Sequence, residues 1–176
     1  MKFTSVPLVG AYLIEVEPTF DERGFFARSW SSAEFGERGL NRNVAQCSIS
    51  FNTKKGTLRG MHYQEQPHAE TKLVRCSSGA IFDVIVDLRP ASANYCKWFG
   101  IELTAANRKM LYVPEGFAHG FQTLTNDTEV FYQISEEYRS ESSKGVRWDD
   151  PLFGIVWPLP VSVLSDRDRS FPNYIP

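Results

Sequence analysis

With 176 residues, 42% of them hydrophobic and 23% charged, the chain has the length and composition of a globular protein with a sizeable core. Its formal net charge of −2 gives no basic field for nucleic acid, and no apolar run approaches the roughly 18 residues of a membrane span. We therefore expect a single domain over residues 1–176 in a soluble, cytoplasmic protein, with no nucleic-acid or membrane partner.

The cysteines and the N-terminus agree with this expectation. Cys47, Cys76 and Cys96 are odd in number and show no paired spacing, which argues against a disulfide framework or a four-cysteine zinc site. The N-terminal residues 1–17 are mildly apolar but are interrupted by Pro7 and Gly10, so they do not resemble a signal peptide. We therefore expect the protein to reside in a reducing compartment.

Short apolar or alternating segments, separated by turn residues, run through most of the chain and predict strands. A helix is expected only at residues 31–40, with Ser31 or Ser32 as the N-cap, and a helical turn near residues 140–145. Leu58–Gln64 has the character of a strand that contains a glycine. The other expected strands are residues 11–17, 71–79, 80–90, 97–107, 109–116, 121–127 and 128–138. This spacing indicates an all-β sandwich or barrel.

Strand parity places two polar side chains among apolar neighbours. Tyr132 shares a side with Val130 and Ile134, and Lys72 shares a side with Val74 and Cys76. An inward lysine is expensive without a partner, so it suggests a site. The alternative is that this side faces solvent and the next residue, leucine, faces inward.

The stretch "LRGMHYQ", residues 58–64, raises a geometric question. In a regular strand His62 would share a face with Gly60, and Arg59 would take the other face. A bulge at Gly60 would re-aim one of the two, so that Arg59 and His62 could serve one pocket.

Two further motifs resemble those of cupin jelly rolls. "YVPEGFAHGF", residues 112–121, carries His119 after a Pro-x-Gly turn, and "GTLRGMHYQ" lies where the first cupin motif belongs. A metal-binding cupin has His-x-His there, whereas this chain has His62-x-Gln64. A site with two histidines and one carboxylate would need another ligand, and His68 lies in an expected loop. We therefore expect no metal.

Together the motifs resemble one family through nearly the whole chain: the dTDP-4-dehydrorhamnose 3,5-epimerases, which are metal-free cupins. The matching segments are residues 21–26, 56–64, 72–76, 82–89, 114–121, 145–151, 154–160 and 164–168. The resemblance implies a cupin-type jelly roll with one or two short helices, no cofactor, and inversion of C3 and C5 in a nucleotide-linked 4-keto-6-deoxyhexose. That reaction needs a base, an acid on the opposite face, and a stabiliser of the enolate oxygen.

The resemblance also assigns the chemical roles. His62 matches the general base and Asp168 its carboxylate partner, Tyr132 matches the proton donor, and Lys72 matches the cation near the enolate oxygen. Read singly, His62 would be a satisfied strand histidine, Tyr132 a core aromatic, and Asp168 a surface residue in a charged turn.

Further positions match the family's substrate contacts. Arg59 and Arg23 match phosphate ligands, because a guanidinium pairs with phosphate oxygens. Arg23 and Phe26 resemble residues donated across a homodimer. The remaining matches are Phe26 and Tyr138 as aromatics that stack on the base, Gln46 as a polar contact to it, Arg167 near the nucleotide, and His119 as a substrate contact.

Three departures cluster around the nucleotide. Arg28 stands where the family often has glutamate, Ser48 where it has asparagine, and Ser143 where it has glutamate. A CDP- or GDP-linked 4-keto sugar, or inversion at C3 or C5 alone, therefore stays open. Other classes are a metal-dependent cupin oxygenase and a non-catalytic sugar-binding cupin.

Overall fold

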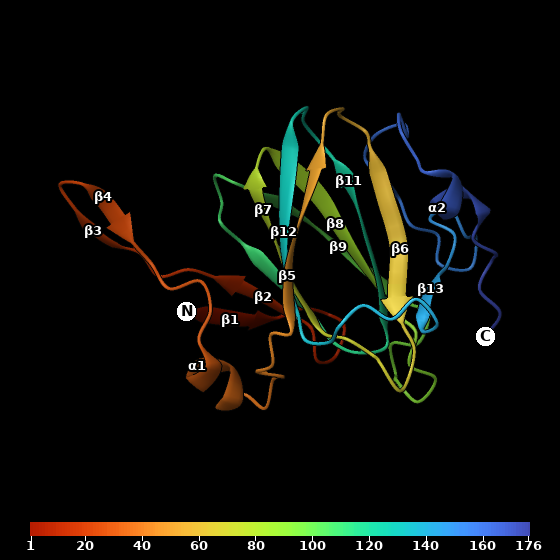
Figure 1. The fold of residues 1–176 in the computed structure, drawn as a ribbon, viewed down its shortest axis with the longest axis horizontal. Coiled ribbons are helices and arrows are strands. Elements are labelled where there is room, and N and C mark those ends of the chain that lie inside the picture. The colour runs from red at the N-terminus through yellow and green to blue at the C-terminus, as the bar shows by residue number, and fades with distance from the viewer.

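The computed structural model describes all 176 residues, and two antiparallel sheets that face each other form its body (Figure 1). The strand order is β1-β2-β10-β7-β12-β5 in the six-stranded sheet and β13-β6-β11-β8-β9 in the five-stranded sheet. Strands that are neighbours in a sheet are mostly distant in sequence, as double-sheet jelly rolls require. The expected all-β jelly roll with two short helices is confirmed.

The elements have the following bounds. The six-stranded sheet contains β1 (Lys2–Ser5), β2 (Tyr12–Glu15), β10 (Met110–Val113), β7 (Lys72–Ser78), β12 (Thr128–Ile134) and β5 (Gln46–Asn52). The five-stranded sheet contains β13 (Ser143–Gly145), β6 (Leu58–Gln64), β11 (Phe117–Thr123), β8 (Ala80–Asp87) and β9 (Trp98–Thr104). A separate hairpin is formed by β3 (Thr19–Asp21) and β4 (Gly24–Phe26), and the helices are α1 (Ser32–Gly36) and α2 (Asp166–Ser170). Neither helix approaches the length or apolarity needed to cross a membrane.

Helix α1 begins as predicted, because the Ser31 hydroxyl accepts the N–H of Glu34 and satisfies a free donor of the first turn. The expected turn near residues 140–145 is present at residues 140–142 and leads directly into strand β13. One other local expectation was wrong, because the charged segment taken for a surface turn is helix α2, capped by Ser165. Strand β11 also begins at Phe117, ahead of the predicted segment, so that His119 lies within a strand.

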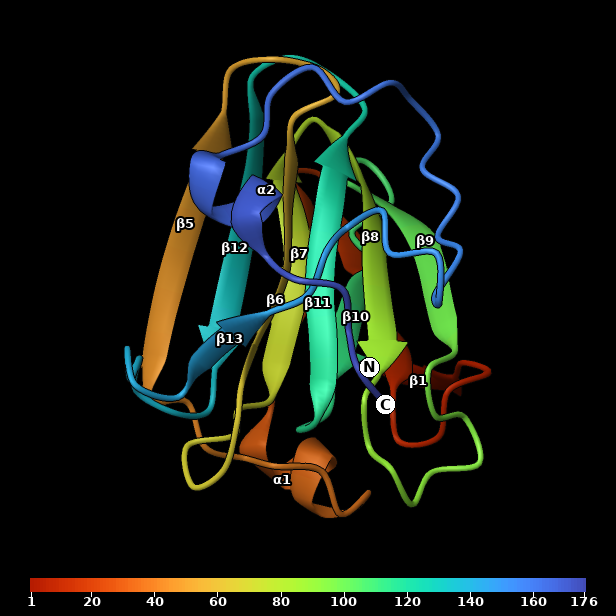
Figure 2. The same ribbon diagram turned by 90° about the vertical axis from the view of Figure 1, so that its right-hand side faces the viewer.

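The core lies between the sheets and is lined by the inward side chains of both. Its fully buried members include Val74, Ile81, Ile85, Leu103, Leu111, Phe121 and Val130. The outer face of the five-stranded sheet is covered as well. Figure 2 shows the C-terminal segment crossing that face, where Phe153, Trp157 and Tyr174 pack against Met61 and Val84. Both faces of this sheet are therefore apolar, and β6 is held from two sides.

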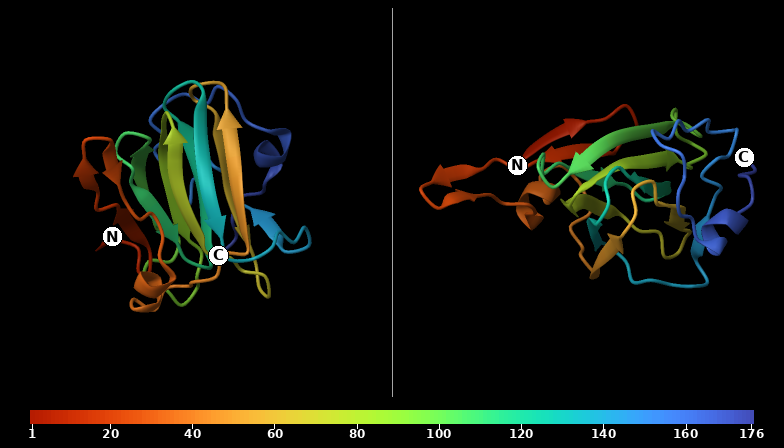
Figure 3. Two further views of the ribbon diagram at one scale, coloured as in Figure 1. Left: turned by 60° about the vertical axis from the view of Figure 1, so that its left-hand side comes forward. Right: turned by 90° about the horizontal axis from the view of Figure 1, so that it is seen from above.

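The β3–β4 hairpin projects away from the body (Figure 1, Figure 3). Phe20 is 73% exposed and Phe26 79% exposed on it. On the six-stranded sheet, the edge strand β5 turns Ile49 and Phe51 outward, each more than half exposed. Large apolar side chains on a projecting hairpin and an open sheet edge are features of an interface.

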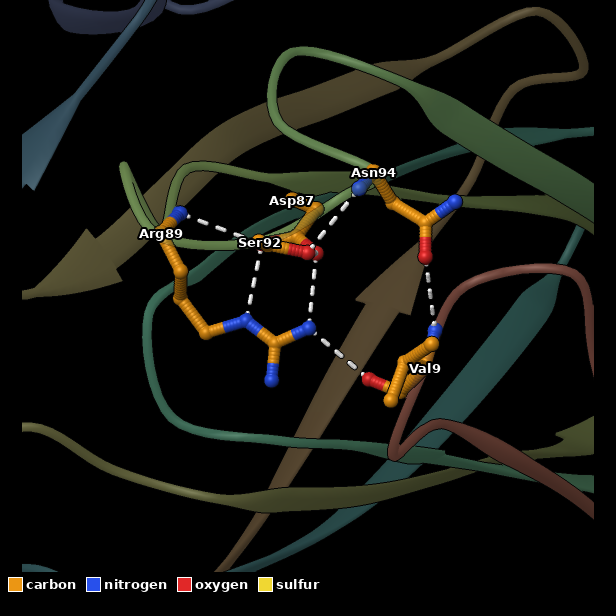
Figure 4. Close-up of polar contacts among 5 residues, drawn as sticks. All are labelled: Val9, Asp87, Arg89, Ser92 and Asn94. Carbon is orange, nitrogen blue, oxygen red and sulfur yellow. Dashed lines mark hydrogen bonds and ion pairs between the residues drawn. The ribbon is translucent and has the colours of Figure 1, made fainter.

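A buried carboxylate joins the end of β8 to the N-terminal segment (Figure 4). Asp87 is fully buried, and its two oxygens accept bonds from Arg89 Nε (2.8 Å), Arg89 Nη2 (2.6 Å) and Ser92 Oγ (2.6 Å). The same Arg89 Nη2 donates to the Val9 carbonyl, while Asn94 accepts the Val9 N–H. Burial alone would raise the pKa of Asp87, but the bonds from Arg89 and Ser92 outweigh it and lower that pKa below its ordinary value.

This network predicts a pH-dependent stability change for Asp87→Asn. A carboxyl with a lowered folded pKa stabilises the fold fully above its ordinary pKa of about 3.8, and this stabilisation is lost as the pH falls through the folded value. We expect the variant to lose about 2 kcal/mol of unfolding free energy at pH 7, measured by urea denaturation. The difference from the parent protein narrows toward pH 3. A difference that stays constant down to pH 3 would contradict this account.

Candidate active site

A cavity of about 400 Å³ lies between the two sheets. Strands β6 and β11 form one wall and strands β5, β7 and β12 the other, so residues far apart in sequence meet in it. The cavity brings together ten of the residues that the sequence predicted: Gln46, Ser48, Arg59, His62, Lys72, His119, Tyr132, Tyr138, Ser143 and Arg167. This size lies within the usual range of small-molecule binding sites.

His62 on β6 forms a close pair with Asp168 on α2. His62 Nε2 lies 2.7 Å from Asp168 Oδ1, and the second carboxylate oxygen accepts the Gly60 N–H at 3.0 Å. Burial alone would raise the pKa of Asp168, but the bond and charge of His62 and the Gly60 N–H lower it on balance. The His62 ring also meets Phe171 edge-on, at 5.8 Å between ring centres. These contacts fix the orientation of an imidazole whose side chain is still 37% exposed toward the cavity.

A bulge in β6 lets neighbouring side chains reach the same cavity. His62 pairs with His119 and Arg59 pairs with Phe121, so two β6 residues, Gly60 and Met61, lie opposite Gly120 alone. Gly60 has φ +135°, and a Cβ placed on it would lie 2.6 Å from the Gly120 Cα. The expected break at Gly60 is therefore present, and it directs both Arg59 and His62 into the cavity.

Arg59 is held by neutral acceptors. Its Nε donates to Asn52 Oδ1 at 2.7 Å, and its Nη2 donates to the Phe51 carbonyl at 3.3 Å. Asn52 is itself 3% exposed and donates to the carbonyls of Ser50 and Thr128, so it cannot turn away. The guanidinium keeps its full positive charge at the cavity, which suits an anionic group of a ligand.

Tyr132 lines the opposite wall from β12. Burial is the largest influence on it and raises the pKa of its phenol, the nearby Asp83 carboxylate raises it further, and Ser50 and Arg59 oppose these effects only in part. The phenol is therefore protonated at neutral pH and can donate a proton. His119 meets the Tyr132 ring edge-on at 6.1 Å, and its Nε2 lies 2.8 Å from Asp83 Oδ1.

Lys72 faces the cavity, as its parity with Val74 predicted, and the alternative of a solvent-facing lysine was wrong. Leu73 is buried too, because α1 and the N-terminal strands cover the other side of the six-stranded sheet at that position. The Lys72 Nζ lies 2.9 Å from Glu70 Oε1. Glu70 was not foreseen, since it lies in a loop where parity gives no direction.

Gln64 occupies the place of the second histidine in a metal-binding cupin, and its amide is fully used by the protein. The amide NH₂ donates to the carbonyls of His68 and Glu137, and the amide oxygen accepts the Arg139 N–H. Gln64 thus ties the loop before β7 to the loop after β12, and the second loop carries Tyr138 to the cavity.

Three predicted substrate contacts do not reach this cavity. Arg23 and Phe26 lie on the projecting hairpin, and the Arg28 guanidinium, 64% exposed, lies 3.6 Å from Glu34. Other polar groups of the site were missed: Ser50, Asn52, Tyr63, Glu70 and Asp83. A signal existed for one of them, because Asp83 is the lone carboxylate within the apolar run "AIFDVIV", residues 80–86.

The jelly roll, with a histidine–carboxylate pair on one wall of the cavity and a half-buried tyrosine and a lysine on the other, defines a cupin-type enzyme with an acid–base pocket. The sequence pattern of the dTDP-4-dehydrorhamnose 3,5-epimerase family matches residues 5–175. The chain belongs to this family of isomerases.

Individual relatives are similar along their whole length. A dTDP-4-dehydrorhamnose 3,5-epimerase of Sinorhizobium fredii is 42% identical over 98% of this chain and 89% of its own. A crystal structure of the enzyme from Elizabethkingia anophelis superimposes with a TM-score of 0.96 at 39% identity, covering 99% of this chain and 96% of that one. The Bacillus anthracis enzyme, solved with TDP and pyrophosphate bound, gives a TM-score of 0.94 at 40% identity and covers 98% and 99%.

The bulge predicts a selective effect of Gly60→Ala. The added Cβ meets the Gly120 backbone, and an alanine at this positive φ is strained as well. We therefore expect the variant to lose about 2–3 kcal/mol of unfolding free energy, and we expect the pairing of His62 with Asp168 to be lost. Gly24→Ala is the matched control, because Gly24 has φ +127° and no neighbour within 4 Å. Its loss should be about 1 kcal/mol, and equal losses for the two variants would show that the close approach to Gly120 is unimportant.

Proposed function

We propose that the whole chain, acting as one domain, inverts C3 and C5 of a dTDP-linked 4-keto-6-deoxyhexose. Protons on the carbons beside a ketone are weakly acidic, because the conjugate base is an enolate. The observation that carries the proposal is the placement of a carboxylate-oriented imidazole, His62, and a protonated phenol, Tyr132, on the two opposite walls of one cavity.

In this proposal His62 removes the proton at C3 or C5. Asp168 orients the imidazole and stabilises the imidazolium that forms, and a positioned base of this kind contributes about 10²–10⁴-fold. The electron pair moves into the C4 carbonyl, where hydrogen bonds from the Lys72 ammonium stabilise the enolate oxygen. Tyr132 then gives its proton to the opposite face of the carbon. His62 loses its proton to water and Tyr132 regains one, which restores both groups.

The remaining cavity residues bind the substrate. Arg59 is the diphosphate ligand at the cavity, because its charge is opposed only by neutral acceptors. Arg167 lies on the rim and donates to Ser143 Oγ at 2.8 Å. Gln46, Ser48 and Tyr138 provide polar and aromatic contacts for the nucleotide, and His119 contacts the sugar. Three free cysteines suit the reducing cytoplasm, where we place the protein.

The second subunit of a homodimer supplies what the protomer lacks. Arg23 and Phe26 are exposed on a hairpin that projects beyond the body, and neither can reach its own cavity from there (Figure 3). Docking this hairpin on a second copy would bury its phenylalanines and bring a guanidinium and an aromatic ring to the partner's cavity.

The proposed reaction is tested by incubation of the protein in D₂O with the dTDP-linked 4-keto-6-deoxyglucose. Because each inversion replaces a carbon-bound proton with one from solvent, we expect deuterium at both C3 and C5, read by NMR and mass spectrometry. Deuterium at C3 alone would identify a 3-epimerase instead. No exchange with dTDP-, CDP- or GDP-linked 4-keto sugars would refute an epimerase.

Two variants test the roles in the same assay. Tyr132→Phe keeps the base and loses the acid, so it should still exchange deuterium while forming little inverted product. His62→Asn should lose exchange by at least about 10²-fold. Full epimerisation by Tyr132→Phe would remove the phenol from its role.

The shared cavity predicts complementation between two subunits that are each impaired in a different way. Arg23→Ala should raise the KM about tenfold or more, because a phosphate ligand is lost from each cavity. Mixed dimers of Arg23→Ala and His62→Asn subunits carry one cavity with both residues intact, so at a substrate concentration well below the parent KM, mixing after mild dissociation should restore up to half of the parent activity per mixed dimer. Light scattering gives the oligomeric state. A monomer, or no recovery on mixing, would contradict donation across the interface.

A further inference from the structure

Arg59 and Lys72 lie toward opposite ends of the cavity. Arg59 is bonded to Asn52, the last residue of β5, whereas Lys72 pairs with Ile134, whose partner on β5 is Gln46, the first residue of that strand. Six residue steps of a strand span about 20 Å. Tyr132, paired with Ser48, lies between the two ends.

The two cations differ in their partners. Arg59 bonds to an amide and a carbonyl, which are neutral, whereas the Lys72 ammonium lies 2.9 Å from the Glu70 carboxylate. The pair is well shielded from solvent, because the Lys72 and Glu70 side chains are only 11% and 10% exposed. A shielded pair has a much smaller field on a third charge than a lone cation has.

The Glu70 carboxylate is fixed by the loop that carries it. Gln64 donates to the His68 carbonyl on one side of Glu70, and the Thr71 N–H donates to Ser135 Oγ at 2.8 Å on the other. Both anchoring groups are buried. The ammonium has three N–H bonds, so one directed at Glu70 leaves two for a ligand oxygen.

We propose that Glu70 is a positioning residue that orients the substrate by cancelling the net charge of Lys72. The cavity must accept a ligand with an anionic diphosphate at one end and an uncharged 4-keto sugar at the other. With Glu70 ionised, the diphosphate is drawn to Arg59 rather than to Lys72, while Lys72 offers its two remaining N–H groups to the neutral carbonyl oxygen. Without Glu70, the Lys72 end attracts phosphate and the ligand binds in an unproductive orientation. This inference rests on the proposed function.

Pyrophosphate binding, measured by isothermal calorimetry, tests directly whether Glu70 prevents Lys72 from attracting a diphosphate. The Arg59→Met variant lacks the cation at the Arg59 end of the cavity, so it should bind pyrophosphate weakly. Adding Glu70→Gln keeps an acceptor of the same shape but frees the Lys72 charge, so we expect pyrophosphate to bind about tenfold more tightly. Adding Lys72→Met as a third substitution should cancel this gain, because the freed cation is then absent.

Glu65→Gln in the same Arg59→Met background is the matched control. Glu65 lies in the same loop and forms an ion pair with Lys144 at 3.2 Å, but both side chains are close to half exposed and lie outside the cavity. It should leave pyrophosphate binding unchanged. Glu70→Ala serves as the second variant should Glu70→Gln fold poorly, with folding checked by thermal unfolding.

Three outcomes overturn the inference: no gain on removing Glu70, an equal gain with Glu65→Gln, or a gain that survives Lys72→Met. None of them depends on turnover. Deuterium exchange by the unmodified protein tests the proposed function separately, so a protein that exchanges normally but shows no gain in pyrophosphate binding rejects the role of Glu70 alone.

Discussion

The contact between the backbones of Gly60 and Gly120 is the constraint on which the site depends. Their close approach leaves no room for a side chain, and it inserts one extra residue into β6 opposite a single residue of β11. Without the bulge, Arg59 and His62 would project from opposite faces of the strand. The Gly60 N–H that the bulge turns outward is also a donor to Asp168. The bulge thus orients the Arg59 guanidinium and the His62 imidazole toward the cavity, and it holds the Asp168 carboxylate beside them.

The bulge makes the cavity depend on the C-terminal segment. Asp168 lies 106 positions after His62 and reaches it only because the chain crosses the outer face of the five-stranded sheet (Figure 2). That crossing is stabilised by apolar packing of Phe153, Trp157 and Tyr174. The imidazole therefore has a rigid strand on one side and a short capped helix on the other. The phenol and the lysine come from the other sheet, so the separation of the two sheets determines the space for the sugar ring.

The sequence predicted the elements whose pattern is set by local burial. Strands such as β7, β8 and β12 have apolar runs between turns, and the parity of Lys72 and Tyr132 places both inward. Strand β5, "QCSISFN", was missed because an edge strand with one wet face has few apolar residues, and α2 was missed because five charged or polar residues give no period. Glu70 lies in a loop, where no periodicity gives a direction. The proposed role of Arg23 and Phe26 depends on a second subunit, which no pattern within one chain describes.

The arrangement of charge along the cavity explains why so few of its groups are ionised without a partner. The His62 imidazole has Asp168, the Lys72 ammonium has Glu70, and Tyr132 stays neutral because burial and Asp83 raise its pKa. Arg59 and Arg167 have only neutral acceptors. In the proposed reaction a proton moves from carbon to the His62 imidazole and another from the Tyr132 phenol to carbon, so the imidazolium and the phenolate that form balance each other's charge within the cavity. The guanidinium of Arg59, which has no carboxylate partner, is proposed to bind the diphosphate, the part of the substrate that does not react.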